Sequence, residues 1–172
     1  MSQYRRWYQP GGWYFFTVVT ADRARRLVGA DAITRLRESF RIVRAQWPYE
    51  MDAAVILPDH LHCIWRLPSD DADFSTRWRL IKGHFARGVQ AVANPRGEKR
   101  VWQRRFWEHL LRDEEDWRRH MDYIHYNPVK HGYVASAGAW PHSSFRHAVA
   151  QGYYDADWGR AEPLTIAGMK CE

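Results

Sequence analysis

The hydrophobic pattern in the first part of the chain predicts three β-strands. Residues 13–19 are aromatic or β-branched on both faces, which is typical of a strand in the centre of a sheet. Residues 53–57 and 60–67 form two further runs joined by a short turn, as in a hairpin. Successive side chains of a strand point to opposite faces, so the second run has one wholly apolar face. Its other face carries His60 and His62 side by side.

Two amphipathic helices are predicted in the first half of the chain, because apolar residues recur there at steps of three and four. The first helix begins with Asp31 as its N-cap and ends before Pro48, which cannot continue a helix. The second helix covers about residues 75–92, and its outer face is rich in basic residues. A short fourth strand is expected at 101–103.

A third helix is predicted to begin after Asp113, which is suited to be its N-cap and is followed by three acidic residues. We expect it to end at Asn127, because Pro128 disfavours helical backbone at the residue before it. From about residue 135 to 172 the pattern becomes irregular. We therefore expect one domain over residues 1–172 with an irregular C-terminal extension.

The order of these elements is strand, helix, strand, strand, helix, strand and a terminal helix. This order predicts an α+β fold of the ferredoxin-like type. Such a fold has a single antiparallel sheet with helices on one face. The other face of the sheet would then be free to hold a functional site.

Composition and charge narrow the choice of partner. A hydrophobic fraction of 45% in 172 residues excludes a disordered chain, and the formal net charge is +6. The ten Trp, nine Tyr and seven Phe exceed what a core of this size needs, so some rings should be exposed and could stack on bases. These features favour a nucleic acid over a membrane. Two cysteines and a polar N-terminus predict a cytoplasmic, reduced protein.

The candidate chemistry joins the third helix to the histidine pair. Tyr123 and Asn127 are four residues apart and so lie on one side of the helix, where they should point towards the edge of the sheet, with His120 near the same line. If this helix packs on the strand that carries His60 and His62, two imidazoles and an amide oxygen can bind one cation. Mixed nitrogen and oxygen ligands suit Mg²⁺ or Mn²⁺.

A tyrosine beside such a cation could attack a phosphodiester, since the metal polarises the phosphoryl group. Tyr123 is the first candidate for the nucleophile. Tyr126 competes for this role, but its position on the helix predicts that it faces solvent. His125 competes for the role of metal ligand, but it lies one position off the line of Tyr123, which favours a role in packing or hydrogen bonding.

Three stretches of the sequence, Pro58–His62, Trp102–His109 and Asp122–Gly132, resemble the REP-associated tyrosine transposases, which belong to the single-tyrosine HUH (IS200-like) transposases. The resemblance implies the HUH endonuclease fold and metal-dependent cutting of single-stranded DNA next to hairpins formed by repetitive extragenic palindromes (REPs). It places Tyr123 at the nucleophile position, with a 5′-phosphotyrosine intermediate. It also places His60 and His62 at the metal-binding pair and Asn127 at the third ligand.

The residues that contact DNA are less well defined by the sequence. Our candidates are basic or aromatic and lie in three segments: Arg5, Arg6, Trp7, Arg77, Arg79, Lys82, Arg104 and Arg105. His120, Glu108 and His109 could support the site, without a role that can be derived. The stretch 140–145 could cover the site as a flap or simply pack in the core.

Two other functions stay open at this point. One is a zinc hydrolase that uses His60, His62 and Cys63, although Cys63 points to the opposite face of its strand. The other is a non-catalytic protein that binds DNA hairpins through its basic, aromatic surface. The chain could act as a monomer or a homodimer.

Overall fold

The structure, a computed structural model, describes residues 6–90 and 100–171. Its centre is one antiparallel sheet with the strand order β2-β3-β1-β4. The strands are β1 (Trp13–Val19), β2 (Glu50–Ile56), β3 (His60–Arg66) and β4 (Trp107–Leu110). The helices are α1 (Ala30–Gln46), α2 (Phe74–Arg87), α3 (Glu114–Lys130) and α4 (Phe145–Ala150), with short 3-10 turns at Ala21–Arg23, Ala137–Ala139 and Leu164–Ile166.

The sheet has the predicted ferredoxin-like order. β1 pairs with β3 on one side and with β4 on the other, so the strand that is apolar on both faces is central, as expected. β2 and β3 form the predicted hairpin, with a register shift between Met51 and Ala53. The fold class inferred from the pattern is confirmed.

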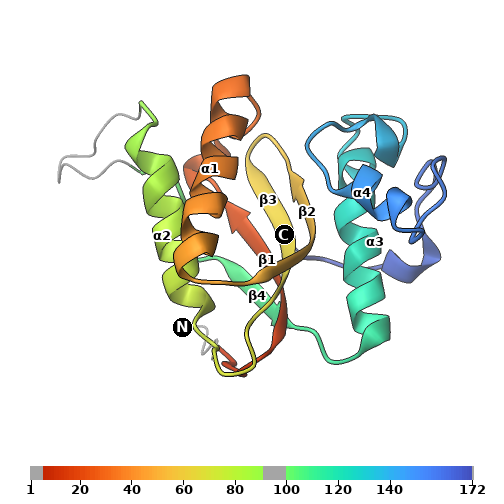
Figure 1. Cartoon of the computed structure of the whole chain (residues 1–172). Coiled ribbons are helices and arrows are strands. Elements are labelled where there is room, and N and C mark those ends of the chain that lie inside the picture. Colours follow the sequence, from red (N-terminus) through yellow and green to blue (C-terminus); the bar gives the residue numbers. More distant parts are fainter. Residues whose placement is uncertain (1–5, 91–99, 172) are drawn as a thin grey trace.

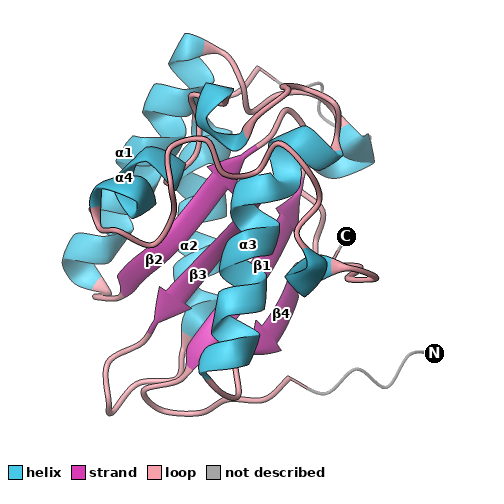
Figure 2. Cartoon of the chain, turned by 90° about the vertical axis from the view of Figure 1, so that its right-hand side faces the viewer, coloured by secondary structure: helices cyan, strands magenta, loops and turns pink. Residues whose placement is uncertain are grey.

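The two faces of the sheet are covered by different helices. α1 and α2 pack on one face, against the apolar side of β3 that carries Leu61, Cys63 and Trp65 (Figure 1). α3 lies across the opposite face, over β3 and β1 (Figure 2). The expectation of helices on one face therefore holds for α1 and α2, but the other face is not left open. α3 forms a second hydrophobic core there with Phe15, Ile64 and residues of the C-terminal segment.

α3 continues past Pro128 to Lys130, so the predicted end at Asn127 is wrong. Pro128 lies in the last turn, where its missing N–H removes only one helical hydrogen bond. The backbone N–H of His131 still donates to the carbonyl of Asn127 at 3.0 Å. The helix is ended by Gly132, whose φ of +71° is the left-handed conformation that favours glycine after a helix.

Other element ends were predicted less well. Asp113 is the N-cap of α3, as expected, and its side chain accepts a hydrogen bond from the backbone of Asp116. The N-cap of α1 is Gly29 rather than Asp31. The fourth strand is Trp107–Leu110, whereas the expected strand at 101–103 makes only an isolated bridge between Trp102 and Thr20. A run that meets its partner at one point cannot form a ladder of paired residues.

The C-terminal segment fixes the outer side of α3 and the edge of β2. The indole of Trp140 donates to the carbonyl of Ile56, and the backbone N–H of Ser144 donates to Ala54. Stretch 140–145 therefore lies against β2 as a packing element, which settles the choice between flap and core in favour of packing.

Within the described residues, no helix is long and apolar enough to span a bilayer.

Candidate active site

His60 and His62 lie on the face of the sheet that α3 covers. Their ring centroids are 4.9 Å apart, and both side chains are buried. Alternation along β3 places Leu61 and Cys63 on the other face, in the core under α1 and α2. The sequence thus brings two rigid imidazoles together at the boundary between the sheet and α3.

Each imidazole is held through its Nδ1 atom. His60 Nδ1 lies 2.7 Å from the carboxylate of Asp59, which can only accept, so this nitrogen carries the proton. His62 Nδ1 lies 2.9 Å from the hydroxyl of Thr17, and that hydroxyl donates its own proton to the carbonyl of Cys171. With Nδ1 as the donor, each ring can offer the lone pair of Nε2, the arrangement in which an imidazole binds a cation.

The Tyr123 side chain reaches this pair from α3. Its ring centroid is 5.4 Å from that of His62 and 6.0 Å from that of Phe15, and the residue is only 1% exposed. Tyr123 therefore lies over the two central strands, so the expectation that it points to the edge of the sheet is wrong. The reason is the position of α3, which crosses the middle of the sheet (Figure 2). The phenolic oxygen accepts a hydrogen bond from Lys130 at 3.0 Å.

The last turns of α3 bring two more polar side chains to the same region. Asn127 is completely buried one turn after Tyr123. The ring of His131, which follows the last helical residue, lies 5.2 Å from that of His60. Sequence reasoning missed Lys130 and His131 because it ended the helix too early. The glycine at 132 was the available signal, since glycine is common just after a helix.

The residues present fit a hard divalent cation. The two imidazoles offer nitrogen ligands and the side chain of Asn127 offers an amide oxygen. Mn²⁺ and Mg²⁺ accept such a mixed set when other oxygens complete the coordination shell. The partial negative charge at the C-terminal end of α3 also favours a cation there. The zinc alternative fits less well, because Cys63 is buried on the far side of the sheet and burial raises the pKa of its thiol well above the ordinary value.

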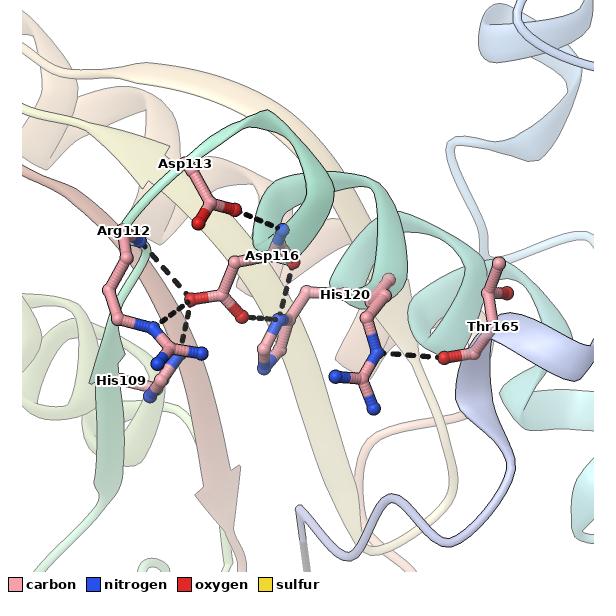
Figure 3. A network of polar contacts seen from close by, with 7 residues as sticks. His109, Arg112, Asp113, Asp116, His120 and Thr165 are labelled. Atoms are coloured by element: carbon pink, nitrogen blue, oxygen red, sulfur yellow. Dashed lines mark hydrogen bonds and ion pairs between the residues drawn. The ribbon is translucent and has the colours of Figure 1, made fainter.

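A second cluster of possible metal ligands lies at the other end of α3. His109, Asp116 and His120 hold their ligand atoms within 4.8 Å of one another. Figure 3 shows the carboxylate of Asp116 among its neighbours. It lies 2.9 Å from His109 Nε2 and 3.2 Å from both Arg112 Nε and His120 Nδ1.

This cluster is better explained as a structural network than as a cation site. Burial opposes ionisation of Asp116, but hydrogen bonds from His109 and Arg112 outweigh it and lower its pKa to about 2. The carboxylate is therefore already neutralised by an adjacent guanidinium. Nδ1 of His120 also points at the backbone carbonyl of Asp116, at 2.8 Å, and burial lowers the pKa of this imidazole. The network fastens the first turn of α3 to β4.

Glu108 lies on the wrong face of the sheet to support the site. It pairs in register with Phe16, whose side chain is in the core under α1 and α2. Its carboxylate is buried and forms an ion pair with Arg6 at 3.3 Å. The expected supporting role of Glu108 is therefore not possible at the histidine pair. His109 and His120 share the correct face but belong to the network at the opposite end of α3.

The candidate DNA-contacting residues divide into two groups. Arg77 is fully buried and binds Asp71 and three backbone carbonyls, so its expected role on the surface is wrong. Lys82 donates to the carbonyl of Gln103 at 2.6 Å, and burial, together with the charge of Arg6, lowers its pKa to about 8. Arg6 is half-buried in its ion pair. The exposed candidates are Trp7, Arg79, Arg104 and Arg105, and Arg5 lies outside the described residues.

The competing residues of α3 are buried in packing roles. Tyr126 is 9% exposed and belongs to the core between α3 and the C-terminal segment, so the prediction that it faces solvent is wrong. That segment covers the outer side of the helix, which the helical pattern alone did not indicate. His125 contacts the hydroxyl of Ser144 at 3.0 Å, and burial lowers its pKa to about 3. It acts in packing and hydrogen bonding, as expected.

Comparison with known proteins gives consistent matches. The family described as "Transposase IS200 like" matches residues 10–125. A REP-associated tyrosine transposase of Escherichia coli K12 is 46% identical over 92% of this chain and 91% of its own length. A Haemophilus influenzae relative is 41% identical over 98% of this chain and 99% of its own. A solved structure of a REP-associated tyrosine transposase bound to a REP hairpin matches with a TM-score of 0.84 and 44% identity, over 99% of this chain and 98% of that chain.

Proposed function

Because the chain belongs to the IS200-like transposase family and, within it, to the REP-associated tyrosine transposases, we propose that it cuts and rejoins single-stranded DNA next to REP-type hairpins. The observation that carries this proposal is the contact of the Tyr123 ring with His62, whose ring in turn lies beside that of His60. A phenol beside two oriented imidazoles is the minimum required for metal-assisted attack on a phosphodiester.

In the proposed reaction the Tyr123 oxygen attacks the scissile phosphorus. A bond from this oxygen to phosphorus forms, the bond from phosphorus to the 3′-oxygen breaks, and the product is a 5′-phosphotyrosine with a free 3′-hydroxyl. The phenolic proton leaves to solvent and the 3′-oxygen takes one from water, so the step is balanced. The rejoining reaction is the reverse, with a 3′-hydroxyl as the attacking group.

His60 and His62 would hold a divalent cation through Nε2, with Asn127 as the third ligand. When bound, such a cation stabilises charge on the phosphoryl oxygens. The chain itself fixes the geometry: Asp59 and Thr17 set the orientation of the two rings. α3 holds the nucleophile against β3, and burial keeps bulk water away from its ring.

The exposed residues Trp7, Arg79, Arg104 and Arg105 are the proposed contacts to DNA. Arginine forks bind phosphates, and an exposed indole can stack on an unpaired base. The solved relative was bound to a REP hairpin, and we propose the same class of partner for this chain.

The test is incubation of the protein with a labelled hairpin oligonucleotide that has single-stranded flanks, with Mg²⁺ or Mn²⁺, followed by a denaturing gel. We expect a covalent protein–DNA adduct that is lost in Tyr123→Phe and kept in Tyr126→Phe. Both variants remove one hydroxyl from a buried tyrosine of α3 and keep the ring, so they are a matched pair. Tight hairpin binding by the wild type without an adduct under either ion would instead identify a non-catalytic hairpin-binding protein.

A further inference from the structure

Lys130 lies on the same side of α3 as Tyr123, two turns further on. Its ammonium group donates a hydrogen bond to the phenolic oxygen at 3.0 Å and lies 4.6 Å from the centre of the Tyr123 ring. Side chains of a helix tilt towards its N-terminus, so a lysine seven residues later can reach back along the helix to the tyrosine. The contact therefore follows from the continuation of α3 past Pro128.

We propose that Lys130 is a catalytic residue, whose ammonium group stabilises the negative charge that develops on the Tyr123 oxygen. This inference rests on the proposed function, in which that oxygen is the nucleophile. The lysine brings a full positive charge to the reacting atom. A charge-assisted hydrogen bond is stronger than a neutral one.

The charge appears on the same oxygen in both directions of the reaction. During cleavage the phenol loses its proton to solvent as its oxygen bonds to phosphorus and the bond to the 3′-oxygen breaks. During rejoining a 3′-oxygen bonds to phosphorus, and the Tyr123 oxygen leaves with the electron pair and then takes a proton from solvent. Lys130 keeps its own protons throughout and acts as a hydrogen-bond donor.

The position of Lys130 suits this role better than a purely structural one. Lys130 is the exposed last residue of the helix, where a lysine has little to gain from packing. Its aliphatic stem could follow the helix in many directions, yet its ammonium group contacts Tyr123, whose ring packs against His62. The C-terminal end of α3 also favours a cation by its dipole.

The test compares the rates of adduct formation and of rejoining in Lys130→Met and Lys130→Arg. We expect both rates to fall about tenfold in Lys130→Met, the usual cost of losing a hydrogen bond from a charged group, and to recover in large part in Lys130→Arg. Arg160→Met, which removes one positive charge from an exposed position of the C-terminal segment, is the control for weaker general attraction to DNA.

A second measurement separates charge stabilisation from a structural effect. When Tyr123 is replaced by a ring-fluorinated tyrosine, whose oxygen carries negative charge more easily, the deficit of Lys130→Met should shrink. Equal rates in Lys130→Met and the wild type, or a deficit that fluorination leaves unchanged, would overturn the role of Lys130 alone. Absence of any adduct in the wild type would overturn the proposed function and this inference together.

Discussion

A polar cluster with two imidazoles lies near each end of α3, and the two clusters differ in their electrostatic surroundings. At the N-terminal end, the carboxylate of Asp116 is surrounded by two imidazoles and the guanidinium of Arg112 (Figure 3). At the C-terminal end, His60 and His62 lie beside the ring of Tyr123, and their Nδ1 atoms are held by the carboxylate of Asp59 and the hydroxyl of Thr17. Both clusters lie between the helix and the same face of the sheet.

The direction of the helix dipole distinguishes the two ends. The first turn of a helix favours anions and the last turn favours cations. Asp116 in the first turn is therefore stabilised as a carboxylate within a closed network, and a divalent ion there would compete with Arg112. The histidine pair lies near the end that favours a cation. By ligand type alone, the cluster with the Asp116 carboxylate would be the better cation site. The neighbouring charges and the helix dipole favour the histidine pair instead.

The largest effect on catalysis is expected when an imidazole is removed near the C-terminal end of α3, whereas removal of one near the N-terminal end should have little effect on the response to metal. Loss of a group that orients a metal ligand costs up to about a hundredfold. Loss of the ligand itself should cost more, so His62→Ala should reduce Mn²⁺-dependent adduct formation by more than about a hundredfold. His109→Ala, which removes an imidazole from the other cluster, should retain the response to Mn²⁺. Single-turnover rates against Mn²⁺ concentration measure both. The comparison fails if the two variants lose the metal response equally.

A stability effect of intermediate size is expected at the N-terminal end. The folded pKa of Asp116 is about 2, below its ordinary value of 3.8, so its contribution is fully present above pH 4 and is lost as the pH falls towards 2. That contribution is about 2 kcal/mol. Asp116→Asn should lower the free energy of unfolding by this amount at pH 6 and flatten its decline in acid, as measured by urea denaturation. An unchanged acid profile would show that the network adds no stability.

A smaller effect is expected from the group that orients His62. Thr17→Val removes the hydroxyl that accepts from Nδ1, so the ring could change tautomer or rotate. We expect about tenfold weaker Mn²⁺ binding, measured by calorimetry, and recovery in Thr17→Ser. Equal Mn²⁺ affinity in the valine and serine variants would mean that the hydroxyl does not set the geometry of the pair.

The smallest effect is expected on DNA binding through α2, where one arginine is buried among protein acceptors and another is exposed to solvent. Arg77 is enclosed by protein acceptors, whereas Arg79 is exposed. Arg79→Gln should weaken hairpin binding a few-fold and reduce the slope of affinity against salt by about one. Arg41→Gln removes an exposed charge from α1 and should change the slope less. An equal change in both variants would indicate attraction by net charge rather than a contact at Arg79.

The strands β1, β2 and β3, the faces of β3 and the helices α1, α2 and α3 could be predicted from the sequence, because the period of the apolar residues reports them directly. The position of β4 and the short helix α4 were missed, since short segments show too few apolar repeats. The proximity of Tyr123 to the histidines was expected only if the helix packs on their strand, and from the family resemblance, because spacing within a helix does not determine which strand the helix covers. The burial of Tyr126 and Arg77 could not be predicted, since it depends on distant segments that cover them. The same is true of Lys130, whose position depends on a proline that the helix accommodates in its last turn.

The most direct test of the account is the location of Mn²⁺ in a crystal of the protein soaked with this ion, determined from its anomalous scattering. We expect one peak at the Nε2 atoms of His60 and His62, next to Asn127 and within reach of the Tyr123 oxygen. A peak at Asp116 between His109 and His120, with none at the histidine pair, would contradict it.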